Sequence, residues 1–404
     1  MASAVAAVKK KTVFPHSDDF SLVLGGPLFQ LLRRTHLTGD ALELLRRRII
    51  LGIMLAWLPL FVLSMLDGNA VGGNVSVPFL MSVEVHVRFL VALPLLIVAE
   101  LVVHQRLISI VRQFDERDLI PEKDRARFEG AINSAFGLRN SVLAEVLLIL
   151  FVYGVGVLLI WRKYIALHNA TWYAVPTDSG MRLSLAGVWY MFVSLPVFQF
   201  LLLRWYFRIF IWARFLWQAS RLELALVPTH PDRLAGLGFL ANTVFAFAPL
   251  LTAHGAMLAG LIANRIFHLG AKLTDFKLLI AALVIVLLGV VVGPLLVFAP
   301  LLSQTKRKGS REYGTLAQQY VREFDAKWLR GEAAADEVLV GSADIQSLAD
   351  LNNSYEVVRS MRFVPVTWDA IVLLVGATLV PLAPLLLTTA TLEELLDRLV
   401  GMLF

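Results

Sequence analysis

The 404-residue sequence contains no cysteine. This absence excludes disulfide bonds, thiolate metal sites and a catalytic thiol. The patterns HExxH, GxxxxGK and GxSxG are also absent, which removes the usual signatures of zinc proteases, nucleotide-binding loops and serine hydrolases. We therefore expect no cofactor and no metal site, and the sequence favours a protein that is not an enzyme.

Charge is scarce as well. Only 17% of the residues are charged while 58% are hydrophobic, and the mean hydropathy is +0.71, values that place the chain in a lipid bilayer. No alternating strand pattern indicates a barrel, so the apolar runs are predicted to be helices. The predicted fold is an all-α, polytopic transmembrane helical bundle of about seven spans. The spans are predicted at 49–66, 86–104, 142–161, 183–204, 240–263, 278–302 and 367–388.

Basic residues are distributed unequally between the predicted loops. If the amino terminus is cytoplasmic, 29 of the 37 Lys and Arg residues lie on the inner side, seven lie outside, and Arg88 falls within a span. This asymmetry predicts an inside amino terminus and an outside carboxyl terminus. It also accounts for the net charge of +6, so nucleic acid is not an expected partner.

The hydropathy profile divides the chain into four segments. Residues 1–48 are predicted to be a cytoplasmic amphipathic segment, and 49–304 the bundle with spans one to six and cytoplasmic helical loops at 105–140 and 205–239. Residues 305–366 are predicted to be cytoplasmic and helical, and 367–404 to hold the last span and an amphipathic tail. Two apolar stripes mark the cytoplasmic helices. They comprise Tyr313, Ala317, Tyr320, Phe324 and Trp328, and then Leu348, Leu351, Tyr355 and Val358.

The fourth span continues into RWYFRIFIWARFLWQASR, so that about 40 residues from Arg182 to Leu222 read as one helix of about 60 Å. Four arginines among aromatic residues are typical of an interfacial anchor that binds anionic lipid headgroups. The alternative is a groove for a specific anionic ligand. The arginines are Arg204, Arg208, Arg214 and Arg221.

Ionisable residues inside spans are candidate functional sites because burial in lipid is costly. Glu100 and Glu145 are predicted near the cytoplasmic leaflet, at the depth of Arg204 and Arg208, and Asp369 begins the last span from the same side. These residues predict either a site for a proton or an ion or, as the favoured alternative, a fixed ion pair. His254 is expected to be neutral and hydrogen-bonded to a neighbouring helix, with proton relay or ligand contact as the alternative.

The stretch VPTHPDRLAGLGFLAN (227–242) separates two apolar runs. Pro231 and Asp232 are typical of a helix start, whereas Gly236 and Gly238 are costly within a helix. We interpret the segment as a structural turn, with a cytoplasmic gate or anion-binding loop as the first alternative and a His–Asp pair acting on lipid as the second. The candidate residues are His230, Asp232, Arg233, Gly236 and Gly238.

Four stretches of the sequence resemble a family of polytopic bacterial inner-membrane proteins for which no activity is established. The resemblance implies a bacterial protein of the inner membrane and assigns no functional residue. The stretches are THPDRLAGLGFL at 229–240, GGPLFQLLRR at 25–34, VHVRFLVALPLLIVAE at 85–100 and GSADIQSLADLNNSYEVVRSMR at 341–362.

These features favour an ion- or proton-linked channel or transporter. The first alternative is a membrane scaffold or sensor that binds a protein partner through its cytoplasmic helices, for which the stripe from Leu348 to Val358 should be exposed. The second is a lipid-acting membrane enzyme.

GVVVG at 289–293 has the spacing of a tight helix crossing. It is expected to pack internally, with contact to a second copy of the chain as the alternative.

Overall fold

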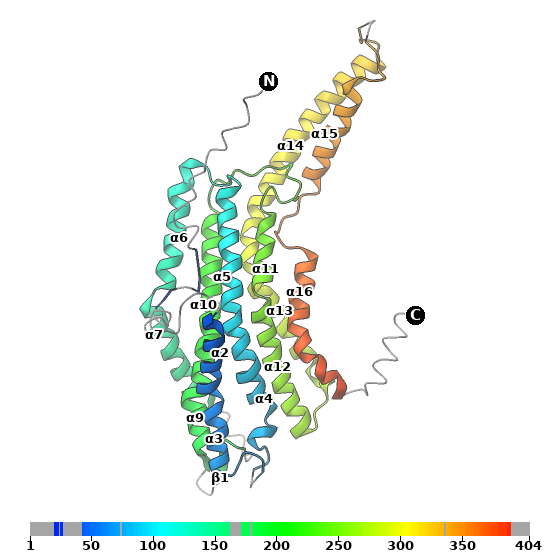
Figure 1. The fold of residues 1–404 in the computed structure, drawn as a ribbon. Coiled ribbons are helices and arrows are strands. Elements are labelled where there is room, and N and C mark those ends of the chain that lie inside the picture. The colour runs from blue at the N-terminus through cyan, green and yellow to red at the C-terminus, as the bar shows by residue number, and fades with distance from the viewer. Residues whose placement is uncertain are drawn as a thin grey trace.

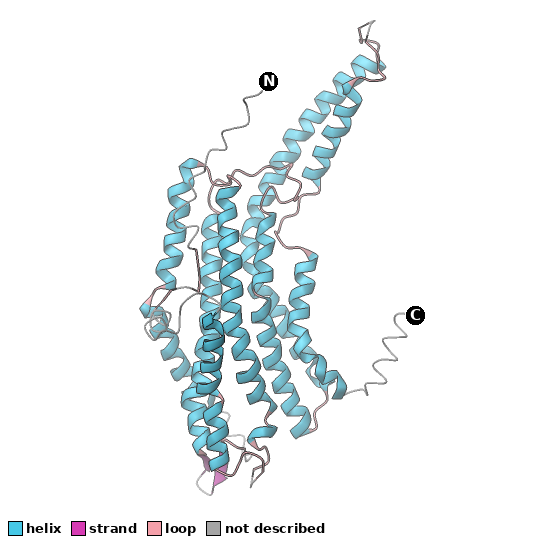
Figure 2. Cartoon of the chain, viewed as in Figure 1, coloured by secondary structure: helices cyan, strands magenta, loops and turns pink. Residues whose placement is uncertain are grey.

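The computed structural model describes residues 20–23, 25–26, 43–72, 75–161, 171–177, 180–334 and 337–388. Most of the predicted segment 1–48 and the whole tail 389–404 therefore lie outside the described residues. The described chain is almost entirely helical (Figure 2). The exception is a small antiparallel hairpin of β1 (Ala174–Thr177) and β2 (Gly180–Leu183), in which Ala174 pairs with Leu183.

Helices, including short 3-10 and π segments labelled η, form a long bundle with one projecting hairpin (Figure 1). In chain order they are α2 (Glu43–Ala56), α3 (Leu58–Leu66), η1 (Phe79–Met81), α4 (Val83–His86), η2 (Val87–Ala92), α5 (Leu93–Glu116), η3 (Glu122–Asp124), α6 (Arg125–Arg139), α7 (Val142–Phe151), η4 (Val152–Trp161), α9 (Leu185–Trp189), η5 (Tyr190–Ser194), α10 (Leu195–Ala219), η6 (Gly238–Ala241), α11 (Asn242–Ala246), α12 (Ala248–Leu269), η7 (Leu273–Phe276), α13 (Lys277–Val292), η8 (Gly293–Phe298), α14 (Ala299–Phe324), η9 (Asp325–Leu329), α15 (Ala343–Arg359), α16 (Trp368–Leu379) and η10 (Val380–Thr388).

Six continuous helical runs among the described residues are long and apolar enough to span a membrane. A seventh span is formed if the bent pair of Glu122–Arg139 and Val142–Gly156, which meet at 45°, counts as one. The predicted all-α polytopic bundle of about seven spans is thus confirmed. The six runs are Leu45–Leu66, Val83–Glu116, Leu185–Ala219, Gly238–Leu269, Leu273–Leu329 and Trp368–Thr388.

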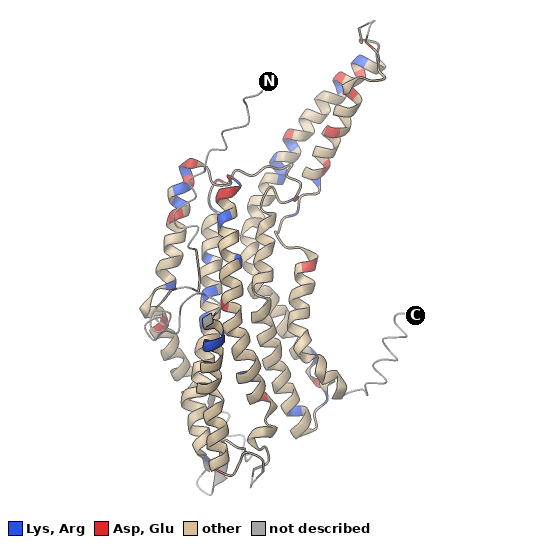
Figure 3. Ribbon diagram, in the orientation of Figure 1, with Lys and Arg blue, Asp and Glu red and all other residues tan. Residues whose placement is uncertain are grey.

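Several runs extend well past the predicted spans because the helices continue into a second, charged layer. Figure 3 shows Lys, Arg, Asp and Glu concentrated in the part of the bundle that carries α6 and in the α14–α15 hairpin. In that layer α10 packs against α6, and Trp205 and Trp212 are 1% and 0% exposed. One face of the aromatic end of the fourth span therefore packs against α6 as part of a protein core, whereas Tyr206, Phe210 and Trp217 on the same helix are 37%, 54% and 49% exposed.

Prolines explain three of the places where the spans depart from regular α-helix. The π segments η2 and η5 each come directly before a helix whose second residue is proline, Pro94 in α5 and Pro196 in α10. Pro294 lies in the 3-10 segment η8 between α13 and α14. Proline lacks an amide hydrogen and crowds the preceding turn, so the local backbone widens or tightens to accommodate it.

The hairpin of α14 and α15 projects beyond the bundle (Figure 1). Its two helices pack through the predicted stripes, with Val358 fully buried and Leu348, Leu351 and Tyr355 half-buried. The second stripe thus lies on a helix, α15, as its spacing predicted. Because the second stripe faces α14, it is not the open partner surface that the scaffold alternative requires.

Glycine permits two close helix approaches around α12. A Cβ added at Gly255 would overlap the carbonyl oxygen of Thr378 in α16, and one at Gly260 would lie 3.1 Å from Cβ of Val87 in η2. By contrast, a Cβ at Gly289 or Gly293 would meet nothing within 4 Å. The two glycines of GVVVG therefore make no close helix crossing within the described chain, although Val291 between them is 2% exposed and packs in the core.

Candidate functional site: a buried ion cluster

Five charged side chains from four helices meet inside the bundle; we call them the ion cluster. Arg48 comes from α2, Glu100 from α5, Glu145 from α7, and Arg204 and Arg208 from α10. Each belongs to a membrane-spanning run or to the bent seventh span. The sequence thus correctly predicted that both glutamates and both α10 arginines converge.

Glu100 is the centre of the cluster. Its Oε1 lies 2.7 Å from Nη1 of Arg208 and 3.9 Å from Nη1 of Arg204, and its Oε2 accepts a hydrogen bond from Arg48. Glu145 meets Nη2 of Arg204 at 3.7 Å. Glu100 is 5% and Arg208 3% exposed, so these charges depend on each other rather than on water for compensation.

The cluster carries an excess of positive charge. Three guanidinium groups face two carboxylates, which leaves a net charge of +1 within this set of described residues. One donor is unsatisfied, because Nη2 of Arg208 is buried and has no hydrogen-bond partner in the described part of the chain. The guanidinium carbon of Arg208 also stacks 4.8 Å from the ring of Trp205. A buried unsatisfied donor on a cation is a costly arrangement that a bound anion would relieve.

Arg48 is the member that sequence reasoning missed. It was counted among the basic residues that precede the first span, but α2 begins at Glu43 and carries Arg48 into the bundle. Two predicted members are not brought to the cluster. Asp369 is exposed in the first turn of α16, and His254 is buried in α12.

His254 is fully hydrogen-bonded by its surroundings. Its Nδ1 lies 2.7 Å from the carbonyl oxygen of Leu250, and its Nε2 lies 2.7 Å from the hydroxyl of Tyr206 in α10. A neutral imidazole satisfies both contacts by donating through Nδ1 and accepting at Nε2. This geometry supports the expected helix-to-helix hydrogen bond.

The remaining α10 arginines have different surroundings. Nη1 of Arg214 donates to the hydroxyl of Ser134 in α6 at 2.6 Å, and the guanidinium of Arg221 lies 5.5 Å from the ring of Trp217. Because Arg204 and Arg208 point into the ion cluster, the predicted contact with lipid headgroups stays a prediction for Arg214 and Arg221.

The segment from 227 to 238 is a turn built around the Asp232 carboxylate. Oδ1 accepts hydrogen bonds from the amides of Leu234 and Gly236, at 2.7 and 3.2 Å, and Oδ2 accepts from the amide of Gly238 at 2.8 Å. Arg233 has a positive φ of 57°. The expected helix start at Pro231 is therefore wrong, because the left-handed backbone and the amide contacts curl the chain around this side chain and the next helical segment begins at Gly238.

The same contacts argue against the alternative in which this segment is an anion-binding loop. The amides that would hold a foreign anion already bind Asp232. Burial opposes ionisation of this carboxyl group, but the amides of Leu234, Gly238 and Gly236 outweigh it and hold the pKa of Asp232 below its ordinary value. His230 adds a smaller effect of the same sign, with Nδ1 3.0 Å from Oδ1.

The turn joins the bundle to the hairpin. A Cβ at Gly309 of α14 would lie 2.6 Å from Cβ of Pro228, and the amide of Arg362 donates to the carbonyl oxygen of Arg233 at 2.8 Å. Nη1 of Arg117 at the end of α5 reaches the carbonyl oxygen of Gly236 at 3.3 Å. The turn is thus a joint that contacts both the bundle and the hairpin, and the predicted gate stays a prediction.

A second charged group lies toward the other end of the bundle. Arg88 of η2 donates to the carboxylate of Glu84 and to the hydroxyl of Tyr190. This arrangement compensates the charge of the arginine that falls within the second span. Glu84 and Arg88 balance each other, in contrast to the ion cluster.

Histidine does not provide a metal site near this group. His86 accepts a hydrogen bond from the indole of Trp57 at Nδ1 (2.9 Å), and its Nε2 lies 3.1 Å from the carbonyl oxygen of Phe79. Both ring nitrogens are therefore occupied. Over the residues that the structure describes, no group of three or more His, Asp or Glu side chains is placed to hold a metal ion.

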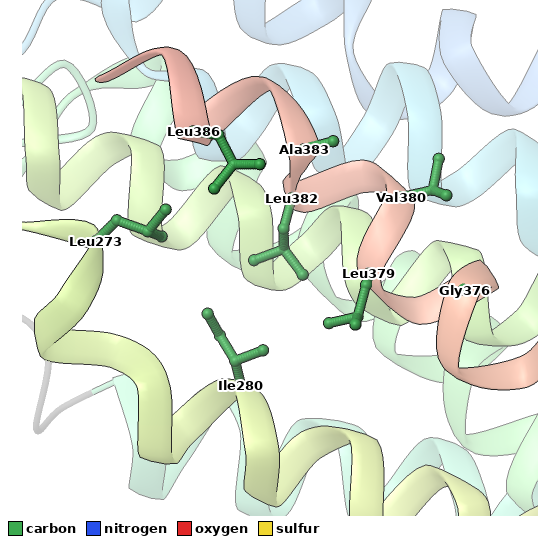
Figure 4. Close-up of a pocket in the computed structure, with 8 residues that line it drawn as sticks. All are labelled: Leu273, Ile280, Gly376, Leu379, Val380, Leu382, Ala383 and Leu386. Carbon is green, nitrogen blue, oxygen red and sulfur yellow. The ribbon is translucent and has the colours of Figure 1, made fainter. Parts of the chain in front are cut away.

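An apolar groove of about 410 Å³ opens between α13 and the α16–η10 run (Figure 4). Ile280 points across it toward Leu379 and Leu382. Its lining offers no side chain that would bind an ion, and no member of the ion cluster reaches it. The lining residues are Leu273, Ile280, Gly376, Leu379, Val380, Leu382, Ala383 and Leu386.

Comparison of the chain with protein-family models, curated proteins and solved structures found no match.

Proposed function

We propose that the protein is a multi-pass channel or transporter of the bacterial inner membrane, with a cytoplasmic amino terminus, and that it binds an anionic solute at the ion cluster. One observation carries this proposal: the cluster has three guanidinium groups against two carboxylates, and Nη2 of Arg208 is buried without a partner among the described residues.

A purely structural ion pair does not need this composition. Two arginines and two glutamates would hold the four helices together with no net charge. A third arginine, here Arg48 with 19% of its side chain exposed, adds a further desolvation cost. Ionisable groups in a membrane domain are expected to serve a function when their cost is not otherwise offset. An anion that accepts from Arg208 would offset both the charge and the unsatisfied donor.

The sign of the unbalanced charge selects the class of solute. Each carboxylate of the cluster faces an arginine, and the surplus is positive. This favours an anion over a metal cation, and it favours an anion over the proton-handling role first considered for Glu100 and Glu145.

Flux measurements test the proposal. The purified protein is reconstituted in liposomes, and uptake of chloride, inorganic phosphate, sulfate and acetate is recorded under gradients of either direction. We expect flux of at least one anion, reduced about tenfold or more in Arg208→Gln, because losing one charge-assisted contact costs about 1.5–3 kcal/mol. Arg106→Gln is the control, since Arg106 is an exposed arginine of α5 outside the cluster.

Two results would overturn the proposal. One is the absence of flux for every anion in the unmodified protein. The other is equal flux in Arg208→Gln and the unmodified protein, which would make the cluster a structural device. Flux of a cation that is lost in Glu100→Gln and Glu145→Gln would favour the original cation or proton hypothesis instead.

A scaffold or sensor is the second candidate, supported by the tip of the hairpin. Val340 is 87% exposed, and Leu329 and Val338 are each 69% exposed. These apolar side chains lie at the tip of the hairpin, away from the bundle (Figure 1), where a protein partner could cover them. A photo-crosslinking residue at Val340 should form an adduct with one protein in cells if the tip binds a partner. The same residue at Glu356, nearer the base of α15, is the control, and equal labelling at both positions would exclude a specific tip partner.

The lipid-acting enzyme has no support from the geometry. Asp232 is engaged by backbone amides and is not poised to act on a substrate. We expect identical lipid profiles in cells that carry the unmodified protein and His230→Ala.

A further inference from the structure

A short amino-terminal segment lies against the ion cluster; we call its described residues, 20–23 and 25–26, the strap. It runs beside α6 and α10 (Figure 1). The ring of Phe20 is fully buried, with ring centroids of Phe136, Trp212 and Phe215 at 5.8, 6.1 and 5.1 Å. The strap is thus part of the folded core in this conformation.

Hydrogen bonds hold the strap near both of its ends. Oγ of Ser21 lies 2.9 Å from Nδ1 of His104, and the carbonyl oxygen of Ser21 accepts from Nη1 of Arg139 at 2.6 Å. The amide of Gly26 donates to Oδ1 of Asn140 at 2.9 Å. Arg139 and Asn140 form the joint between α6 and α7, so the strap is fixed to the point where the bent span changes direction.

Gly26 lies directly over the ion cluster. A Cβ added there would be 3.1 Å from Oε1 of Glu145, 3.7 Å from Nη2 of Arg204 and 2.9 Å from the carbonyl oxygen of Arg139. Its φ of +89° is also one that other residues rarely adopt. Glycine is required here because the backbone itself covers the Glu145–Arg204 ion pair.

We propose that the strap is a built-in closure of the ion cluster, so that its departure opens Glu145 and Arg204 to anions arriving from the side of the α6–α7 joint. This inference rests on the anion-binding function proposed above. With the strap seated, Arg204 is 6% and Glu145 9% exposed. The protein therefore has a closed state, described here, and a minor open state in which the strap is unseated.

Gly26→Ala tests the inference because the added methyl group and the positive φ both oppose seating. Gly68→Ala is the matched control: Gly68 also has a positive φ, +72°, but a Cβ there meets nothing within 4 Å. The chain has no native cysteine, so Leu22→Cys, at a position that is 1% exposed, reports strap position through its rate of maleimide labelling. Inorganic phosphate and chloride flux in liposomes reports opening.

We expect Gly26→Ala to raise both the labelling rate and the anion flux roughly tenfold or more, as for a state that is initially a few per cent populated, while Gly68→Ala changes neither. Asn140→Ala, which removes the acceptor for the Gly26 amide without adding bulk, should act in the same direction. It keeps the test valid if Gly26→Ala does not fold, as judged by size-exclusion chromatography.

The outcomes separate this inference from the function on which it rests. If the strap-releasing variants label faster but show unchanged flux, or change neither quantity, the strap is not a closure. Measurable flux in the unmodified protein would still support the proposed function in that case. Absence of flux for every anion in the unmodified protein overturns the proposed function and, with it, the closure that rests on it.

Discussion

Replacing Glu100 by glutamine removes the negative charge at the centre of the ion cluster. The carboxylate now meets Arg208 at 2.7 Å, Arg204 at 3.9 Å and Arg48 by a direct hydrogen bond. Without it, the buried Arg204 and Arg208 and the partly buried Arg48 are left with Glu145 as the one remaining carboxylate of the cluster. Breaking a buried ion pair by removing one partner costs about 3–5 kcal/mol, so we expect Glu100→Gln to lower the free energy of unfolding by about that amount.

Glu145→Gln is the matched comparison. Its carboxylate meets Arg204 at 3.7 Å, a longer contact than the one between Arg208 and Glu100, so losing this contact is expected to cost less than losing the contacts of Glu100. Unfolding in detergent, followed by the fluorescence of the nine tryptophans, gives the order of the two variants. The double variant Glu100→Gln with Arg208→Met should recover part of the loss, because it removes one of the stranded charges.

The reasoning is refuted if Glu100→Gln is as stable as the unmodified protein, or if the two glutamine variants lose equal stability. Either result would mean that the charges of the cluster are compensated by something other than the contacts between these side chains. A double variant that is less stable than Glu100→Gln alone would contradict the account of the surplus positive charge.

Three further predictions concern the joint and the helix contacts. Asp232→Ala should leave three turn amides without their acceptor and destabilise the joint by about 1–3 kcal/mol, measured as faster proteolysis of the hairpin. Because the folded pKa of Asp232 lies below its unfolded value, its contribution is present above the unfolded pKa and is lost as pH falls below about 4. A loss of protection of the Gly238 amide in acid, measured against the intrinsic exchange rate at the same pH and absent from the alanine variant, would show this. Gly255→Ala should separate α12 from α16 by forcing a methyl group against Thr378 and cost about 1–3 kcal/mol in thermal unfolding. Gly289→Ala, with open space around the added atom, should be neutral or slightly stabilising.

The sequence predicted the helical class and the approximate number of spans because hydrocarbon length sets a strong, local requirement on composition. It did not predict the ends of the spans. The runs that contain α5 and α10 continue to Glu116 and Ala219, since their polar ends pack against α6 instead of stopping at the membrane surface. Hydropathy measures the cost of leaving water and carries no information about such packing.

The site was predicted in part for a related reason. Glu100, Glu145, Arg204 and Arg208 were recognised because charge inside an apolar run is conspicuous. Arg48 was missed because it sits in a basic stretch that topology alone explains. Nothing in the sequence marks the strap as a neighbour of Glu145 and Arg204. The role of Asp232 was also misjudged, because hydrogen bonding from three later amides depends on positive φ values at Arg233 and Ala235 that residue type does not suggest.

The helical run from Leu273 to Leu329 contains 57 residues, a length of about 85 Å at 1.5 Å per residue. Roughly 30 Å of it suffices to cross the hydrocarbon, so about 55 Å extends outside as one arm of the hairpin. If this helix tilts by about 10° within the bilayer, the end that lies about 55 Å outside moves by about 10 Å. Small rearrangements among the lipid-embedded segments are thereby magnified where Leu329 and Val340 meet the surrounding solution.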